Sequence, residues 1–393
     1  IVGYQQLCHR WPEVSYRRGL ASAESMQGEL LAQSGDDKQA RAVLERVMEQ
    51  LDGLVSQDAE NLELLRERAE KRVLLASVLR SLGDTAAELQ AYEQSAADYQ
   101  SIDRQRSGVP VIRQQLAVCL TDKGNLLQYL QRGHDATEPL IEAIVILNEL
   151  VLAYGRPEYH EQVAASRAML GEVYRDLGKY DESRQLLHSS LDTYAQLVAA
   201  KPEVLSYVER QAVTRGQLGQ TLAASDHTEA AANELRTAIT EFDGLLELAP
   251  ATPSYLNGAA YTNWNLGEAL FSISPEAASA AFGHAIELWE RIGSISSSPE
   301  YANSFAHFLV NCVDAKRRDA KRAIQLAERS IQAQPANTRY LTTLASACYQ
   351  HGDLARCEKT LSPLVHDGRA QGAGQFFLAM TLAKQGQAVA ARQ

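Results

Sequence analysis

The chain has 393 residues, of which 45% are hydrophobic and 22% charged, and its formal net charge is −11. This composition excludes an intrinsically disordered chain, and the negative balance argues against nucleic acid or an anionic membrane as partner, since both require clustered positive charge. The most apolar stretch, Leu140–Tyr154, contains Glu142 and Glu149, so we expect no membrane insertion of this segment.

Helix-breaking prolines recur along the first three quarters of the chain. These prolines are Pro12, Pro110, Pro157, Pro202, Pro253 and Pro299. The last five are separated by 47, 45, 51 and 46 residues, and the 98 residues from Pro12 to Pro110 leave room for two units. The sequence begins at Ile1 in what reads as the inside of a helix, so we expect a fragment of a longer protein. A regular period of this length indicates a repeat architecture.

Each unit has the same internal order of residues. Its first helical run carries a small residue where two helices must approach closely: Gly28, Ala76, Gly124, Gly171, Gly219 and Gly267. Seven residues later, four units have a turn residue, which is Gly35, Gly83, Gly178 or Asp226. The third unit has Gly133, two residues later than this spacing, and the sixth unit has Ser274-Pro275. A second amphipathic run follows, as in Asp181–Val198. Each unit is therefore predicted to be a helix, a turn and a second helix.

The period shortens near the C-terminal end. Leu344-Ala345 and Leu378-Ala379 are each followed by a turn glycine, Gly352 and Gly386, which are 34 residues apart. We therefore predict a long-period array with a repeat of about 47 residues and longer helices over residues 1–303, and short-period units over residues 304–393. The last unit stops at Gln393 as its second helix begins, so it is expected to be truncated.

Several units carry a recognisable motif. Leu170-Gly171-x-x-Tyr174 in a first helix, Ala278-x-x-x-Phe282 and Ala231-x-x-x-Leu235 in second helices, and a closing Pro335 resemble the tetratricopeptide repeat (TPR) family. The resemblance implies an all-α fold, a TPR-like α-solenoid of about nine antiparallel helix pairs forming a right-handed superhelix, with the first helices lining a concave face. Glu88 departs from this pattern, because it stands where a small residue is expected.

The long period and the proline that opens each unit are similar to the C-terminal TPR region of planctomycete serine/threonine protein kinases. This narrower resemblance implies the regulatory or docking region of a larger bacterial protein. No kinase signature is present in the chain, so a kinase domain would have to precede residue 1.

Motifs of catalysis are absent from the sequence. It has no phosphate-binding loop, no Gly-x-Ser-x-Gly, no His-Glu-x-x-His and no Cys-x-x-Cys, so neither enzyme activity of this segment nor a cofactor or metal is expected. Its cysteines are odd in number and fit no metal or disulfide spacing: Cys8, Cys119, Cys312, Cys348 and Cys357. We expect buried free thiols, which favour a reducing, cytoplasmic compartment.

The stretch YTNWNLGEALF, residues 261–271, supplies candidate groove residues. Tyr261, Trp264, Glu268 and Phe271 follow one stripe of the helix, beside the stripe that packs within the pair. In the TPR family that stripe faces the groove, and its equivalents in earlier units are Glu172, Arg175 and Gln220. Aromatic side chains rimmed by charge bind peptides well, so these residues form the predicted peptide-binding groove. The alternative is that the aromatic residues pack against the next unit.

One dense basic cluster stands out in the acidic chain. It is a candidate for binding an acidic peptide or a phosphate group and consists of Lys316, Arg317, Arg318, Lys321 and Arg322. The alternative is a solvated corner between two helices.

The sequence therefore predicts a non-catalytic scaffold that binds a peptide or protein segment in its concave groove. A self-assembly module that forms homo-oligomers is one alternative, because the open ends of solenoids stack. An enzyme with a helical-repeat active site is another, and it is disfavoured because no converging acid, base or metal-binding residues are found.

Overall fold

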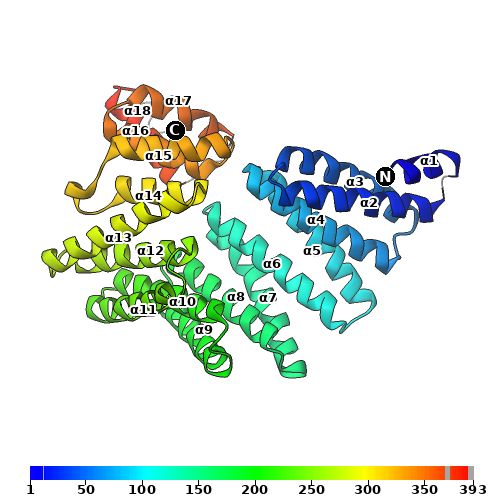
Figure 1. Cartoon of the computed structure of the whole chain (residues 1–393), viewed down its shortest axis with the longest axis horizontal. Helices are drawn as coiled ribbons and strands as arrows, with labels where there is room; N and C mark the ends of the chain where they lie inside the picture. The colour runs from blue at the N-terminus through cyan, green and yellow to red at the C-terminus, as the bar shows by residue number, and fades with distance from the viewer. Residues whose placement is uncertain (12, 368–371, 388–393) are drawn as a thin grey trace. The chain divides into compact units, whose positions relative to one another are not determined.

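The computed structural model describes residues 1–11, 13–367 and 372–387. In these ranges it is entirely helical, with 18 α-helices, one short 3₁₀ helix and no strand (Figure 1), which confirms the predicted fold class. The helices are α1 (Val2–Arg10), α2 (Val14–Gln33), α3 (Asp37–Gln57), α4 (Leu62–Leu82), α5 (Thr85–Gln105), α6 (Pro110–Tyr129), α7 (Gly133–Tyr154), α8 (Pro157–Asp176), α9 (Tyr180–Ala200), α10 (Leu205–Ala224), α11 (Thr228–Leu248), α12 (Pro253–Leu270), α13 (Pro275–Ile295), α14 (Pro299–Asn311), η1 (Ala315–Arg317), α15 (Ala320–Ala333), α16 (Thr338–His351), α17 (Leu354–His366) and α18 (Ala373–Lys384).

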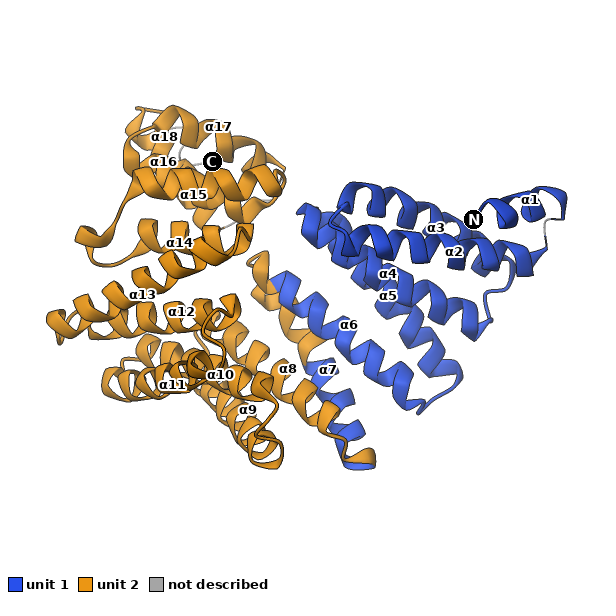
Figure 2. Ribbon diagram, viewed as in Figure 1, with its two compact units in different colours: residues 1–127, 141–153 blue, residues 128–140, 154–393 orange. Residues whose placement is uncertain are grey.

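The chain forms two compact units (Figure 2). Unit 1 comprises residues 1–127 and 141–153, and unit 2 comprises residues 128–140 and 154–393. Helices α2 to α13 are 18 to 22 residues long, whereas α14 to α18 have 12 to 14 residues, so the expected change in helix length is present and begins at α14. The predicted domain boundary at residues 303 and 304, and the right-handed superhelix, stay predictions.

Prolines mark the starts of helices, as their spacing indicates. Pro110, Pro157, Pro253 and Pro299 are the first residues of α6, α8, α12 and α14. Proline is favoured at this position because its missing N–H is one of the donors that a helix start leaves without a partner. Pro202 lies in the turn before α10. Pro12 and residues 388–393, on which the expected truncation of the last unit falls, lie outside the described residues.

The small residues allow close helix packing within a pair. A Cβ atom on Gly267 would lie 2.4 Å from the ring of Phe282, and one on Gly219 would lie 2.6 Å from Leu235. Phe282 and Leu235 both come from the second helix of the same pair, where each is the last residue of the Ala-x-x-x-Phe-like motif. The predicted packing of Phe282 against Gly267 is therefore confirmed.

In most pairs, the turn after the first helix contains a residue with left-handed backbone geometry, whereas the turns after α12 and α14 do not. The φ angle lies between 59° and 92° at Gly35, Gly83, Gln131, Gly178, Asp226, Gly352 and Gly386. In the third unit the expectation was wrong, because Gln131 adopts this geometry and Gly133 is the first residue of α7. Gln131 lies seven residues after Gly124, so the spacing holds although the residue type does not.

Neighbouring pairs stack mainly through the second helix of one pair and the first helix of the next, and several first helices also contact one another. In unit 2, α8 contacts α10, α10 contacts α12, and α14 contacts α16, whereas α9, α11 and α13 have no comparable contacts with one another. First helices that approach one another more closely than the second helices lie on the inner side of the curve. The first helices of unit 2 therefore line its concave face, as the TPR resemblance implies.

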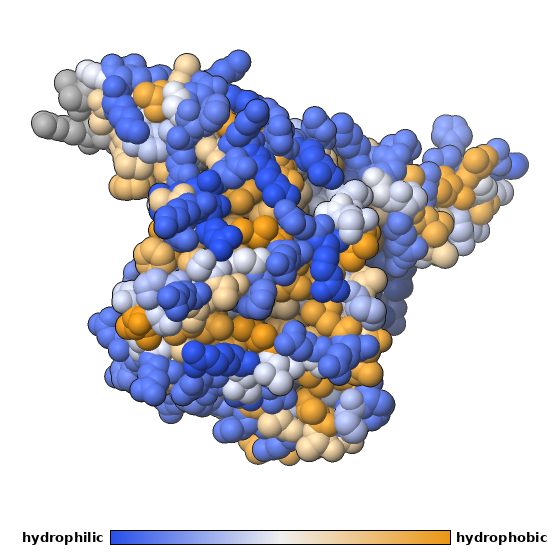
Figure 3. Space-filling view, turned by 60° about the vertical axis from the view of Figure 1, so that its left-hand side comes forward, coloured by the Kyte–Doolittle hydropathy of each residue, from blue (hydrophilic) through white to orange (hydrophobic). Residues whose placement is uncertain are grey.

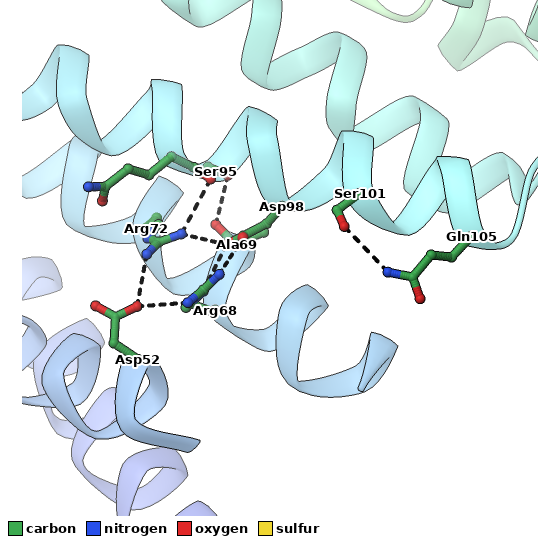
Figure 4. Close-up of polar contacts among 9 residues, drawn as sticks. Asp52, Arg68, Ala69, Arg72, Ser95, Asp98, Ser101 and Gln105 are labelled. Atoms are coloured by element: carbon green, nitrogen blue, oxygen red, sulfur yellow. Dashed lines mark hydrogen bonds and ion pairs between the residues drawn. The ribbon is translucent and has the colours of Figure 1, made fainter. Parts of the chain in front are cut away.

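Unit 1 contains a buried ion-pair network that joins three helices (Figure 4). Asp98 of α5 accepts hydrogen bonds from Arg72 Nη1 at 2.5 Å and from Arg68 Nη2 at 2.6 Å, both on α4. Asp52 of α3 accepts from the same two guanidinium groups at 2.9 and 3.0 Å. The side chains of Arg72 and Asp98 are only 9% and 7% exposed. Such a network holds the relative positions of helices, because removal of either partner leaves a buried charge.

Glu88 is accommodated by an ion pair. Its side chain is 2% exposed, and it accepts a hydrogen bond from Arg80 Nε at 2.8 Å. Burial raises the pKa of Glu88, and Arg80 opposes that effect. The charged partner across the pair explains how a glutamate occupies a position where a small residue is expected.

Two further findings concern the cysteines and the membrane. The cysteines are free thiols, of which Cys119, Cys312, Cys348 and Cys357 are buried and Cys8 is half-buried. No helix in the described ranges is both long enough and apolar enough to cross a bilayer.

Candidate functional site

A cavity of about 430 Å³ opens in unit 2 between the first helices of four successive pairs. It is lined by Glu172 of α8; Glu209, Val213, Gly216, Gln217 and Gln220 of α10; Phe242 of α11; Ser254, Asn257, Gly258, Tyr261, Thr262 and Asn265 of α12; and Glu300 and Tyr301 of α14. All of them except Phe242 come from first helices. The cavity thus lies on the concave face of this unit.

The charges that line the cavity are all negative in the described part of the chain. Glu172, Glu209 and Glu300 contribute carboxylates, and no lysine, arginine or histidine is among the lining residues. Burial, followed by the charges of Glu300 and Glu209, raises the pKa of the Tyr301 hydroxyl. The Tyr301 hydroxyl is therefore influenced by the carboxylates of both Glu300 and Glu209.

Three of the predicted groove residues lie together at one end of the cavity. Arg175 Nη1 lies 3.9 Å from Glu172 Oε1 and donates a hydrogen bond to Gln220 Oε1. Burial nevertheless raises the pKa of Glu172, because it outweighs the attraction of Arg175. Beside them, Gln217 Oε1 is buried and has no hydrogen-bond partner. This end of the cavity offers both a desolvated carboxylate and an unused acceptor.

The floor of the cavity is formed by small residues. A Cβ atom on Gly216 would be 3.6 Å from Thr262 Oγ1, an ordinary contact, whereas one on Gly258 would lie 2.3 Å from the Phe242 ring. Gly258 is thus required for packing. A Cβ atom on Gly216 would contact only Thr262, so a larger side chain at this position would extend into the cavity.

Trp264 does not lie in this cavity, which corrects the expectation of an exposed groove aromatic. Its side chain is 7% exposed. Its ring centroid lies 6.2 Å from that of Trp289 and 5.4 Å from that of Phe308, on α13 and α14. The indole Nε1 donates a hydrogen bond to Glu268 Oε1 at 2.8 Å. The alternative interpretation, packing against the next unit, describes Trp264.

The other predicted residues of α12 divide between packing and the cavity. Tyr261 is half-buried, stacks on Trp264 with ring centroids 5.9 Å apart, and lines the cavity. Burial raises the pKa of Glu268. Phe271 is 36% exposed and lies beside Phe282, with ring centroids 6.4 Å apart. Of the four, only Tyr261 is a lining residue.

Some residues at this face were not anticipated from the sequence. His307 of α14 packs against Trp264 with ring centroids 5.5 Å apart, and burial together with Arg339 lowers the pKa of His307 to about 4. Tyr129 Oη donates a hydrogen bond to Asn337 Oδ1 at 2.7 Å, and Arg339 lies over the Tyr129 ring at 5.7 Å. Glu209 and Glu300 were also not anticipated, because each is the only carboxylate on its own helix.

The basic cluster is largely committed to contacts within the protein. Arg317 Nη2 donates to Ser279 Oγ at 2.9 Å, and Arg318 Nε donates to the Cys312 carbonyl at 2.7 Å. Arg322 donates to Glu290 at 2.9 Å, while Lys316 and Lys321 are exposed. The anion-binding role of this cluster stays a prediction.

A second cavity, of about 730 Å³, lies at α16 and α17. Its walls are mainly apolar and include Leu341 and Leu364, and its guanidinium, on Arg356, is held by Glu328. In the described ranges no group of three histidine, cysteine, aspartate or glutamate residues is arranged to hold a metal ion.

Exposed apolar side chains do not define a binding site as clearly as the concave cavity does. On the face that Figure 3 shows, hydrophobic residues reach the surface in patches separated by hydrophilic ones. The most exposed large side chains are Leu152 at 87%, Leu248 at 70% and Val2 at 67%, which lie near the ends of different helices. The concave cavity is therefore the best-defined candidate.

Comparisons with known proteins support the repeat. Residues 163–200, in α8 and α9, match the family model of the tetratricopeptide repeat, and no curated relative matches the chain. The apo form of RapI aligns with a TM-score of 0.55 at 11% identity, over 82% of this chain and 98% of that chain. A Rap protein complexed with Competence and Sporulation Factor aligns with a TM-score of 0.47 at 15% identity, over 95% of each chain. A tetratricopeptide repeat protein from Parabacteroides merdae ATCC 43184 aligns with a TM-score of 0.44 at 13% identity, over 82% of this chain and 99% of that chain. The likeness to RapI shows a shared fold.

Proposed function

We propose that this TPR-like chain is a non-catalytic protein-interaction scaffold, and that the cavity between α8, α10, α12 and α14 binds an extended segment of a protein partner. The observation that carries the proposal is the position of the cavity, whose walls come from the first helices of four successive pairs. A volume of about 430 Å³ lies in the range of known small-ligand sites and suits one or two side chains of a bound segment.

The chemistry of the walls suits a polypeptide. The amide side chains of Gln217, Gln220, Asn257 and Asn265 combine donors and acceptors, as the backbone of an extended peptide requires. Tyr261 adds a half-buried aromatic surface, of the kind that contributes strongly to binding. Because these groups already stand on packed helices, the site needs little ordering before it binds.

A larger side chain at Gly216 tests the site. We expect that random 12-residue peptides displayed on phage are captured by the full chain and that the captured peptides fail to bind Gly216→Phe. The matched control is Gly244→Phe, since Gly244 is also helical but exposed on α11 with open space around it. Circular dichroism confirms that both variants are folded. Capture of no peptides, or of peptides that bind Gly216→Phe as well as they bind the control, contradicts the proposal.

The kinase-associated role is a narrower proposal that rests on the cadence of the repeats. It predicts a serine/threonine kinase domain encoded before Ile1, and the upstream gene sequence tests it directly. Self-assembly stays the alternative, and light scattering of the chain over a range of concentrations distinguishes a monomer from growing oligomers.

A further inference from the structure

We infer that the segment bound in this cavity presents a lysine or arginine side chain, whose cation lies between Glu209 and Glu300 beside Tyr301. This inference rests on the proposed function, since it names the chemistry of the partner at the same cavity. It rests on the carboxylates of the cavity wall, on the absence of a described basic side chain that neutralises Glu209 or Glu300, and on the aromatic rings that line the same cavity.

The first step concerns unsatisfied charge. Within the described ranges, neither Glu209 nor Glu300 forms an ion pair or accepts a side-chain hydrogen bond, whereas Glu172 has Arg175 at 3.9 Å. Two carboxylates near the same helices are paired, since Glu234 and Glu241 of α11 both contact Arg215 of α10. The cavity wall therefore has two carboxylates that no described basic side chain neutralises, one half-buried (Glu209) and one exposed (Glu300).

The second step concerns convergence. Glu209 lies on α10 and Glu300 on α14, yet both line one cavity and both raise the pKa of the Tyr301 hydroxyl. Glu209 also raises the pKa of Tyr255, on the helix between them. Two like charges from different helices that line one cavity create a local negative potential, which favours an incoming cation over an anion or a neutral group.

The third step concerns the form of the cation. Tyr301 offers an aromatic ring next to the carboxylates, and Tyr261 offers a second ring on the same wall. Ammonium and guanidinium groups bind both carboxylates and aromatic faces, and their long alkyl stems pack on apolar walls such as Val213. A lysine or arginine side chain can contact the carboxylates, an aromatic ring and the apolar wall at the same time.

The experiment starts from the peptides captured by the wild-type chain and rejected by Gly216→Phe. We expect these cavity-dependent 12-residue peptides to be enriched in lysine and arginine. Their dissociation constants, measured by fluorescence polarisation, are expected to rise by about tenfold or more with Glu209→Gln/Glu300→Gln, because two charge-assisted contacts are lost. Binding is also expected to weaken as salt concentration increases.

The matched control removes the same charge from a different surface. Glu247 and Glu287 are exposed on the second helices α11 and α13, so Glu247→Gln/Glu287→Gln is expected to leave affinity within about twofold of the wild type. Cavity-dependent peptides that are neutral or acidic, or that bind the two double variants equally, overturn the inference while the proposed function stands. If no cavity-dependent peptide is captured, the result contradicts both the inference and the proposed function.

Discussion

At the scale of single residues, Trp264 shows how burial decides a role. Its ring contacts Tyr261 of its own helix, Trp289 of α13, and His307 and Phe308 of α14. Aromatic pairs of this kind contribute about 0.5–1.5 kcal/mol each beyond the burial of their area. Its indole N–H is satisfied by Glu268. The residue therefore joins three helices of unit 2, and its contribution is to stability.

Replacement of Trp264 tests this assignment. Trp264→Ala is expected to lower the free energy of unfolding by about 3–5 kcal/mol, since a large cavity is left in the core. Thermal unfolding followed by circular dichroism measures the effect. Trp11→Ala is the control, because Trp11 is 46% exposed and should change the melting temperature little. An unchanged melting temperature for Trp264→Ala, together with lost peptide binding, would restore Trp264 as a groove residue.

At the scale of the helix pair, the turn residue decides how the first helix ends. At Gly178 the φ angle is 74°, and a Cβ atom there would meet nothing within 4 Å. Any cost of a side chain at this position is therefore a cost of backbone conformation, because L-residues other than glycine rarely adopt this region. Gln131 and Asp226 adopt a positive φ angle in their own units despite this conformational cost.

A pair of glycine variants separates the backbone effect from packing. Gly178→Ala is expected to destabilise the chain by about 1 kcal/mol, because alanine disfavours a positive φ angle. Gly244→Ala is expected to stabilise it by about 0.5–1 kcal/mol, because Gly244 is inside α11 and alanine is the better helix former. Both sites are exposed with open space around the Cα atom. Urea unfolding shifts of the same sign for the two variants would contradict this explanation.

At the scale of the whole molecule, contacts in unit 2 also join segments that are far apart in the sequence. Tyr129 and Asn337 are separated by 208 positions and share a hydrogen bond of 2.7 Å. Asn337 is also the N-cap of α16, where its side chain accepts from the backbone N–H groups of Arg339 and Tyr340. The start of α16 is thus tied to the segment that opens unit 2.

Removal of one hydroxyl group tests this long-range contact. Tyr129→Phe keeps the ring under Arg339 but removes the donor to Asn337, and the loss is expected to be about 1 kcal/mol. Hydrogen exchange at the Arg339 and Tyr340 amides should accelerate by about fivefold if α16 opens locally. Tyr180→Phe serves as the control, because Tyr180 is also half-buried and its hydroxyl has no hydrogen bond in the described structure. Equal exchange in both variants would show that the contact contributes nothing.

The sequence alone determined what depends on local contacts. Prolines at helix starts, the contact of Gly267 with Phe282, and the turn seven residues after the small residue in four units all involve neighbours within one pair, so the repeated sequence pattern predicts them. Glu172 and Gln220 line the cavity, and it was the resemblance to the TPR family that placed them at the groove.

Only the tertiary structure decided which side of Trp264 meets another helix and which carboxylates share a cavity. Two adjacent stripes of α12 are both apolar, and the placement of α14 decides which of them is covered. Glu209 and Glu300 are 91 residues apart in the sequence, and both line one cavity because α10, α12 and α14 lie together in the fold. Positions that depend on how separate pairs pack cannot be read from the period of a repeat, since the period describes each pair and not the space between several of them.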